Sequence, residues 1–152
     1  MRRILITGMS GTGKSTILEA LAVRGFRTVE LEGDWCVPLP AGRQRWDEAK
    51  VSALLDDDAG DVLVVAGCED NMGAFLPRFD RVILLSAPVD VILERLETRT
   101  TNDFGKSSDE RERIVADIVE VEPLLRRIAD AEIDTSAAPE ETLAQVLAAI
   151  DG

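Results

Sequence analysis

The sequence contains no histidine and only two cysteines among its 152 residues. Without histidine, the chain cannot build a Ser-His-Asp or Cys-His catalytic centre, or a zinc site with imidazole ligands. Any general base must therefore be a carboxylate. Cys36 and Cys68 lie far apart in the sequence, which argues against a disulfide framework and indicates a reducing compartment. We therefore expect a cytoplasmic protein.

Excess positive charge and long apolar runs are also absent. The net charge is −12, and a nucleic-acid backbone requires a basic face, so we expect no nucleic-acid partner. No apolar run approaches the roughly 20 residues that cross a bilayer, and the chain enters a predicted strand too early to leave room for a signal peptide, so we expect no membrane partner. The length and the 45% hydrophobic share predict a single globular domain over residues 1–152, present as a monomer or a homodimer.

One motif dominates what is present. Residues 8–16 read Gly-Met-Ser-Gly-Thr-Gly-Lys-Ser-Thr, between an apolar segment at 3–7 and a helical pattern at 14–23. This is the strand–loop–helix context of a phosphate-binding P-loop. The glycines let backbone N–H groups point at phosphate oxygens, and the helix N-terminus adds its positive dipole end. Nucleotide contacts are predicted for the following residues: Gly8, Ser10, Gly11, Thr12, Gly13, Lys14, Ser15 and Thr16.

The chemistry of this motif predicts a bound nucleoside triphosphate with Mg²⁺. Lys14 reaches the β- and γ-phosphates, and the Ser15 hydroxyl joins the Mg²⁺ shell. No residue clearly identifies the base, so ATP and GTP both remain possible, and we take ATP as the expected cofactor.

Apolar runs alternate with helical patterns along the whole chain. Strands are predicted at 3–7, 27–31, 62–66, 81–86 and 132–134, and helices at 14–23, 46–55, 90–97, 109–129 and 139–150. Strand–helix alternation predicts an α/β fold in which a five-stranded parallel sheet lies between two helical layers, the αβα sandwich of P-loop NTPases. Ligands of such sheets bind at the carboxyl ends of the strands.

Two stretches interrupt this alternation. The first lies within about residues 32–60, and its segment 32–45 is rich in Gly, Pro and Trp. The second, about residues 98–112, is polar and contains the turn signal Asn-Asp-Phe-Gly at 102–105. Because neither is long enough to form a domain, we interpret them as a substrate flap and a lid.

Missing motifs narrow the class of P-loop protein. Motors and transport ATPases usually carry an acidic residue at the end of an apolar strand, whereas residues 62–66 run into Gly67 and Cys68. A switch GTPase carries an Asn-Lys-x-Asp motif, and none is present. These absences argue against a motor, a transport ATPase and a switch GTPase.

The chain resembles the P-loop small-molecule kinases, which include shikimate kinase, gluconate kinase and the nucleoside monophosphate kinases. The resemblance lies in the P-loop, in Asp34 shortly after the second strand, in Gly67 at the end of the third, and in the helical segment 92–99 before a polar lid. It implies an ATP-dependent, Mg²⁺-dependent transfer of the γ-phosphate to a hydroxyl or phosphate of a small molecule. The alternative is a regulatory module or slow ATPase that binds nucleotide without a dedicated acceptor.

The resemblance also implies roles for individual residues. Lys14, Asp34, Arg95 and Arg99 are the predicted catalytic residues, with Asp34 facing the acceptor hydroxyl and joining Ser15 at the metal. Arg95 and Arg99 share a helix face and are expected to contact the nucleotide, as is Ser136 in the loop after the last strand. A turn or cap role for Asp34, and a solvent-exposed ion-paired face for the two arginines, remain open.

The acceptor is expected to meet six residues near the flap, namely Asp34, Trp35, Arg43, Arg45, Gly67 and Asn71. An aromatic ring with two arginines predicts an anionic or ring-bearing acceptor. Trp35 is equally compatible with a packing role, and for Trp46 we predict that role.

Overall fold

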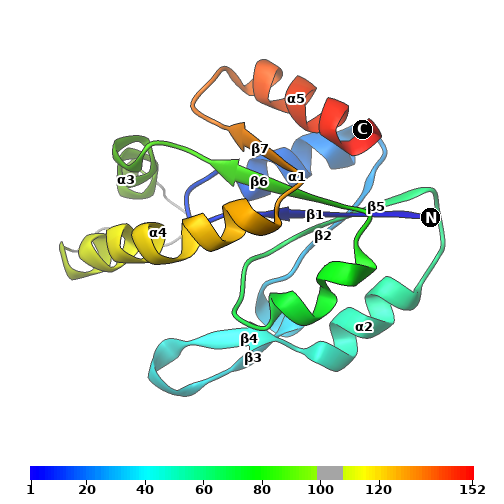
Figure 1. The fold of residues 1–152 in the computed structure, drawn as a ribbon, viewed down its shortest axis with the longest axis horizontal. Coiled ribbons are helices and arrows are strands. Elements are labelled where there is room, and N and C mark those ends of the chain that lie inside the picture. Colours follow the sequence, from blue (N-terminus) through cyan, green and yellow to red (C-terminus); the bar gives the residue numbers. More distant parts are fainter. Residues whose placement is uncertain (99–107) are drawn as a thin grey trace.

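The computed structural model describes residues 1–98 and 108–152 and shows a central parallel sheet with helices on both faces (Figure 1). The strands are β1 (Arg2–Thr7), β2 (Arg27–Glu30), β5 (Val62–Ala66), β6 (Arg81–Ser86) and β7 (Ala131–Asp134). Their order is β2-β5-β1-β6-β7, with every pairing parallel. The predicted five-stranded αβα fold is confirmed.

The sheet is buried on both sides because its central strands are apolar throughout. Ile4, Leu5 and Ile6 of β1 are all 0% exposed, and β5 and β6 are similarly covered. Continuous apolar runs of this kind are typical of parallel strands that lie between two helical layers. The sheet therefore forms the rigid base from which the connecting loops extend at the carboxyl ends of the strands.

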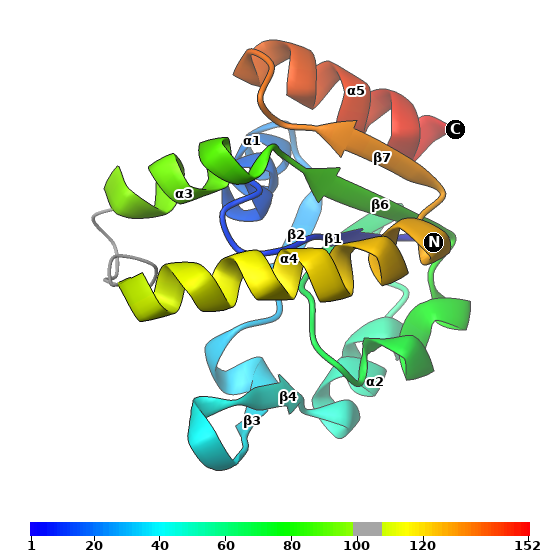
Figure 2. The same ribbon diagram turned by 60° about the vertical axis from the view of Figure 1, so that its left-hand side comes forward.

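Two separate cores form the layers. Helices α1 (Lys14–Val23) and α5 (Pro139–Asp151) pack on one face, whereas α2 (Glu48–Asp56), the 3₁₀ helix η3 (Met72–Arg78) and α4 (Ser108–Ile128) cover the other. Helix α3 (Val89–Thr98) packs against α4 through a third, smaller cluster, and the two run side by side at one end of the sheet (Figure 2).

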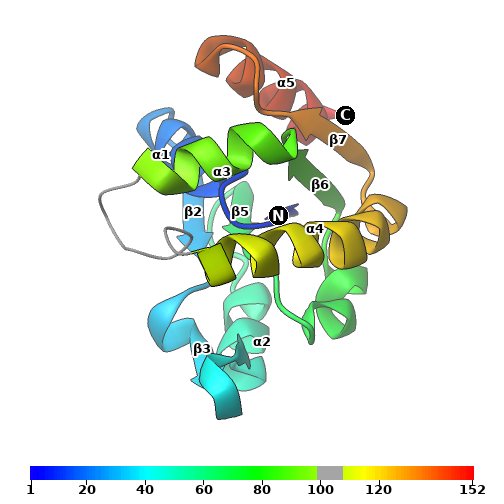
Figure 3. The same cartoon turned by 90° about the vertical axis from the view of Figure 1, so that its left-hand side faces the viewer.

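The predicted flap contains structure that the sequence patterns did not indicate. A 3₁₀ turn η1 (Gly33–Trp35) leads into a hairpin of β3 (Cys36–Pro38) and β4 (Gln44–Trp46), with the 3₁₀ turn η2 (Pro40–Gly42) at its tip. The hairpin extends on the opposite side of the sheet from α1 and α5 (Figure 3). Three-residue strands are too short to show a hydrophobic period.

Helix boundaries differ from expectation mainly beside the flap and the lid. A helix was expected from Trp46, but Trp46 ends β4, and α2 begins at Glu48 after Asp47 accepts a capping hydrogen bond from Lys50 N. Trp46 is 0% exposed, as predicted. Most of the predicted lid, 98–112, falls at 99–107, outside the described residues.

Two further expectations concern the thiols and the membrane. Cys36 and Cys68 are both free. Within 1–98 and 108–152, none of the helices combines the length and apolarity that a bilayer crossing requires.

Candidate active site

The loop of residues 8–13 joins β1 to α1 at the carboxyl end of the sheet and depends on its glycines. Gly11 and Gly13 have φ angles of 82° and 96°, in the left-handed region that favours glycine. A Cβ on Gly8 would lie 2.5 Å from the carbonyl oxygen of Leu85. A side chain at Gly8 would therefore clash with the end of β6, and a side chain at Gly11 or Gly13 would strain the backbone.

Lys14 lies at the first turn of α1 and folds back over this loop. Its Nζ donates hydrogen bonds to Gly8 O at 2.6 Å and Met9 O at 3.0 Å. Burial lowers the pKa of Lys14, whereas the nearby side chains of Cys68 and three glutamates oppose that shift. The glutamates are Glu30, Glu32 and Glu69. The ammonium group thus lies among carboxylates.

A cavity of about 1080 Å³ opens beside the P-loop. Seven of the predicted site residues line it, namely Ser10, Gly11, Gly13, Lys14, Ser15, Thr16 and Arg95. Thr12 is fully buried and its hydroxyl donates to Met9 O at 2.7 Å, so its side chain stabilises the loop from within. The structure thus places most of the predicted P-loop residues at one cavity.

Four glutamates that were not predicted line the same cavity, namely Glu19, Glu30, Glu32 and Glu140. Glu30 ends β2, and Glu32 follows two residues later. The Ser15 hydroxyl donates to Glu30 Oε1 at 2.5 Å. The position of Glu30 and Glu32 at the carboxyl end of a parallel strand is a sequence signal for ligand contact, whereas the family pattern points to Asp34.

Another part of the cavity wall is formed by the loop after β7 and the start of α5. Its lining there includes Thr135, Ala137, Pro139 and Leu143. Ser136, the predicted contact, does not line it. Its N–H and hydroxyl both donate to Asp134 Oδ1, at 2.8 and 2.6 Å. Those bonds lower the pKa of Asp134.

Arg95 is the one predicted lid arginine that can be placed. Its guanidinium contacts Gly11 O and both the hydroxyl and the carbonyl oxygen of Thr135. Arg99 lies outside the described residues.

Asp34 and Trp35 line a different hollow. It has a volume of about 510 Å³ and is bounded also by Lys50, Ala53 and Leu54. Lys50 Nζ donates to the backbone oxygen of Asp34 at 2.7 Å. The structure therefore brings Ser15 together with Glu30, whereas Asp34 is placed at the second hollow.

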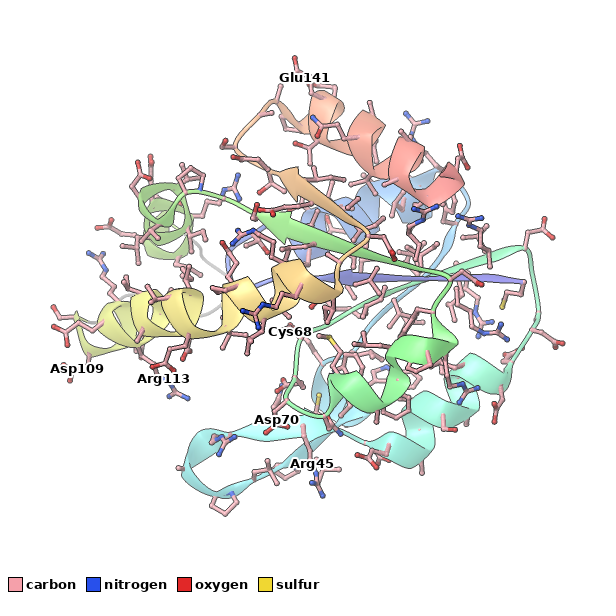
Figure 4. All side chains as sticks on the ribbon, viewed as in Figure 1. Arg45, Cys68, Asp70, Asp109, Arg113 and Glu141 are labelled. Atoms are coloured by element: carbon pink, nitrogen blue, oxygen red, sulfur yellow. The ribbon has the colours of Figure 1, made fainter. Side chains whose placement is uncertain are left out.

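The two flap arginines do not line the P-loop cavity either. Arg43 forms an ion pair with Asp70 at 3.1 Å, and both side chains are more than half exposed. Arg45 lies between Gln44 and Trp46 in β4. Because successive side chains of a strand point to opposite faces, Arg45 projects from the face of the hairpin opposite to Trp46. Figure 4 shows Arg45 on the outer side of the hairpin, with Asp70 between the hairpin and Cys68.

Gly67 and Asn71 act on the flap rather than on the cavity in this conformation. A Cβ on Gly67 would lie 2.9 Å from the Trp46 ring, so glycine lets the indole pack against the end of β5. The Asn71 side chain accepts from Trp46 N at 3.0 Å and donates to Trp46 O at 2.9 Å and to Glu48. Asn71 thereby joins the hairpin to the loop after β5.

Glu69 connects this loop to the charges around Lys14. It accepts a hydrogen bond from Gln44 at 3.0 Å. Burial raises the pKa of Glu69, as do the neighbouring charges of Asp70 and Glu32, while the Gln44 hydrogen bond and Lys14 oppose the shift.

A metal ion would need ligands beyond the protein here. In the part of the chain that the structure describes, no three His, Cys, Asp or Glu side chains are grouped as a metal site. That is compatible with Mg²⁺ in nucleotide sites, where phosphates and water supply most of the ligands.

Comparisons with known proteins indicate the family and the fold of the chain. Residues 4–116 match the family model described as AAA domain. Shikimate kinase 2 of Yersinia enterocolitica is 29% identical over 163 residues, covering 95% of this chain and 92% of that protein. An adenylate kinase isoenzyme 6 homolog of Caenorhabditis elegans is 34% identical over 122 residues, covering 66% and 61%. The crystal structure of shikimate kinase from Bacteroides thetaiotaomicron has the same fold, with a TM-score of 0.72, 18% identity and 99% of each chain covered.

Proposed function

The chain belongs to the AAA domain family and is a P-loop small-molecule kinase, and from this premise we propose that it transfers the γ-phosphoryl group of ATP to a small-molecule acceptor. The observation that carries the proposal is the placement of Lys14, Ser15 and Glu32 around one cavity. This cavity combines a phosphate-binding loop with a carboxylate that accepts a proton, as transfer to a hydroxyl requires.

In the proposed reaction the acceptor oxygen forms a bond to the γ-phosphorus while the bond to the bridging oxygen breaks, and ADP leaves. Lys14 and the loop N–H groups stabilise the charge of the transferring group. Glu32 takes the hydroxyl proton, since it lines the same cavity as Lys14 and its charge acts on the Lys14 ammonium group, whereas Asp34 borders the second hollow. This proposal differs from the sequence-based prediction that Asp34 faces the acceptor.

Ser15 and Glu30 are the residues that would hold Mg²⁺. Their oxygens lie 2.5 Å apart and are the hard donors that this ion prefers. When bound, the ion neutralises phosphate charge. Glu30 also positions the Ser15 hydroxyl through their hydrogen bond.

The charges around the acceptor side favour a neutral or amine-bearing acceptor. The charges of Glu30, Glu32 and Glu69 all oppose the lowering of the Lys14 pKa by burial, so these carboxylates lie near its ammonium group. Lys14 and Arg95 are the cations among the described residues that line the cavity, and Arg95 is bound to Thr135 and Gly11. The prediction of an anionic acceptor relied on Arg43 and Arg45, which do not line it.

A charge-graded acceptor panel tests this function. The protein, ATP labelled in the γ-phosphate and Mg²⁺ are incubated with neutral sugars and nucleosides, amino sugars, and anionic acceptors such as shikimate, gluconate and AMP. We expect labelled product with a neutral or amine-bearing member. Slow ADP release that no member accelerates would instead support the nucleotide-binding alternative, and efficient transfer to an anion would contradict the charge argument.

Two matched variants identify the carboxylate that serves the acceptor. Glu32→Gln and Asp34→Asn each remove one charge without changing side-chain size. We expect Glu32→Gln to lower kcat by about 100-fold, a typical loss of general base catalysis, with ATP affinity retained. We expect Asp34→Asn to change kcat little. The reverse pattern would restore the role predicted for Asp34.

A further inference from the structure

Arg95 reaches across from α3 to contact the P-loop and the loop after β7 together. Its Nη1 donates to Gly11 O at 3.1 Å and to the Thr135 hydroxyl at 2.9 Å, and its Nη2 donates to Thr135 O at 2.6 Å. The planar guanidinium is suited to such forked bonding. Arg95 is thus engaged with protein oxygens on two loops.

Thr135 completes this arrangement from the other side. Its hydroxyl lies 2.7 Å from Thr12 O and 3.3 Å from Ser86 O, while it accepts from Arg95. A hydroxyl has a single proton, so the shorter contact to Thr12 O is the donated bond. Thr135 is 7% exposed, and its own N–H donates to Ser86 O at 2.8 Å, which fixes it to the end of β6.

These contacts hold two successive carbonyl groups of the P-loop, those of Gly11 and Thr12. In a planar trans peptide the C=O and the following N–H point in opposite directions. Fixing Thr12 O therefore fixes the direction of the Gly13 N–H group, in a residue that lines the cavity. A P-loop binds phosphate through such N–H groups.

We propose that Arg95 and Thr135 are positioning residues that preorganise the P-loop for the nucleotide, with Arg95 acting through loop carbonyls rather than on the γ-phosphate. The inference rests on the proposed function only in taking ATP as the nucleotide. Holding the loop before binding removes an ordering cost that would otherwise weaken affinity.

The two roles for Arg95 predict different nucleotide selectivity. A misdirected loop weakens contacts to phosphates that ATP and ADP share, so both lose affinity by the same factor. An arginine on the γ-phosphate would affect ATP and leave ADP almost unchanged.

The test measures ATP and ADP binding by calorimetry for the parent chain, Thr135→Val, Thr135→Ser and Arg95→Met. Valine has the shape of threonine without the hydroxyl and leaves buried polar groups unpartnered, so we expect both nucleotides to bind about tenfold more weakly. Serine keeps the hydroxyl, and we expect affinity within about threefold of the parent. Arg95→Met should match Thr135→Val for both nucleotides.

A double-mutant cycle completes the experiment. Since the two residues act as one unit, the Thr135→Val/Arg95→Met chain should lose much less than the product of the single losses. The proposal would be overturned if Arg95→Met weakened ATP binding but not ADP binding, and if the double variant lost ATP affinity by the product of the two single losses.

A second readout needs no nucleotide. NMR order parameters of the Gly11 and Gly13 amides should fall in Thr135→Val and be retained in Thr135→Ser. Unchanged order parameters in Thr135→Val would also overturn the proposal. If the protein bound no nucleotide at all, the proposed function would fail while this measurement still tested the positioning role.

If Arg95→Met does not fold, Arg95→Lys replaces it in the binding experiment, because lysine keeps the charge without the forked guanidinium.

Discussion

The P-loop and the flap hairpin both follow strands at the carboxyl end of the sheet, but different kinds of interaction hold them. Backbone conformation and short-range contacts shape much of the P-loop, such as the bonds from Lys14 and Thr12 to Met9 O. The hairpin is held by side chains of a loop far along the chain, with Asn71 bound to Trp46, Asp70 to Arg43 and Glu69 to Gln44. The locally determined part of the P-loop leaves a motif in the sequence, whereas the long-range contacts that Arg95 and Thr135 make with it, like those of the hairpin, leave almost none.

The largest expected effect lies on the P-loop side. Lys14→Ala should lower phosphoryl transfer by at least about 1000-fold, because it removes the positive charge that stabilises the transferring group. Single-turnover kinetics measures the loss, and thermal unfolding checks that the fold persists. Loss of less than about tenfold would show that Lys14 does not serve the reaction.

Substitutions in the contacts that hold the hairpin should change the stability of the fold more than the activity. Asn71→Ala leaves the backbone N–H and C=O of Trp46 without their side-chain partner, at an expected cost of about 1–3 kcal/mol in the free energy of unfolding. The neighbouring Asp70→Ala breaks only an exposed ion pair, for which we expect about 0–1 kcal/mol. Urea unfolding of the two variants compares them directly, and equal losses would remove the distinction between the two contacts.

The smallest effect concerns the charge of Glu69 where the two regions meet. Burial raises its pKa above the ordinary 4.5, so the folded state binds this proton more tightly than the unfolded chain does. The resulting stability is present below the unfolded pKa and is lost as pH rises through the folded pKa. Glu69→Gln keeps an acceptor for Gln44 and removes the half-buried charge.

We therefore expect Glu69→Gln to raise the free energy of unfolding slightly at about pH 7 and not at about pH 4. Thermal unfolding across this pH range measures the difference. A variant less stable than the parent at neutral pH would show that attraction between Glu69 and Lys14 outweighs the cost of burial.

The distinction between local and long-range contacts also explains which parts of the structure could be predicted from the sequence. Helix α1 begins and ends at Lys14 and Val23 as expected, and the five strands lie where the apolar runs placed them. Periodicity and glycine chemistry are local properties, so these elements were accessible from sequence alone.

The long-range contacts of the site were less accessible because they join distant segments of the chain. The contact between Ser15 and Glu30 follows from β2 and β1 both pairing with β5, a register that the sequence does not state. The Thr135 contact with Thr12 joins residues 123 positions apart. The family pattern points to Asp34, whereas the carboxyl end of β2 places Glu30 and Glu32 at the P-loop cavity.

The packing of Trp46 against Gly67 has an optical consequence. The chain has no tyrosine and two tryptophans, Trp35 and Trp46, and both lie in the flap. Ultraviolet emission excited near 295 nm therefore arises from this region alone. Trp46 is enclosed and Trp35 is partly exposed, so their emission maxima should separate and quenchers should reach Trp35 first. The protein thus carries an intrinsic fluorescent probe in its flap, with Trp35 at the second hollow.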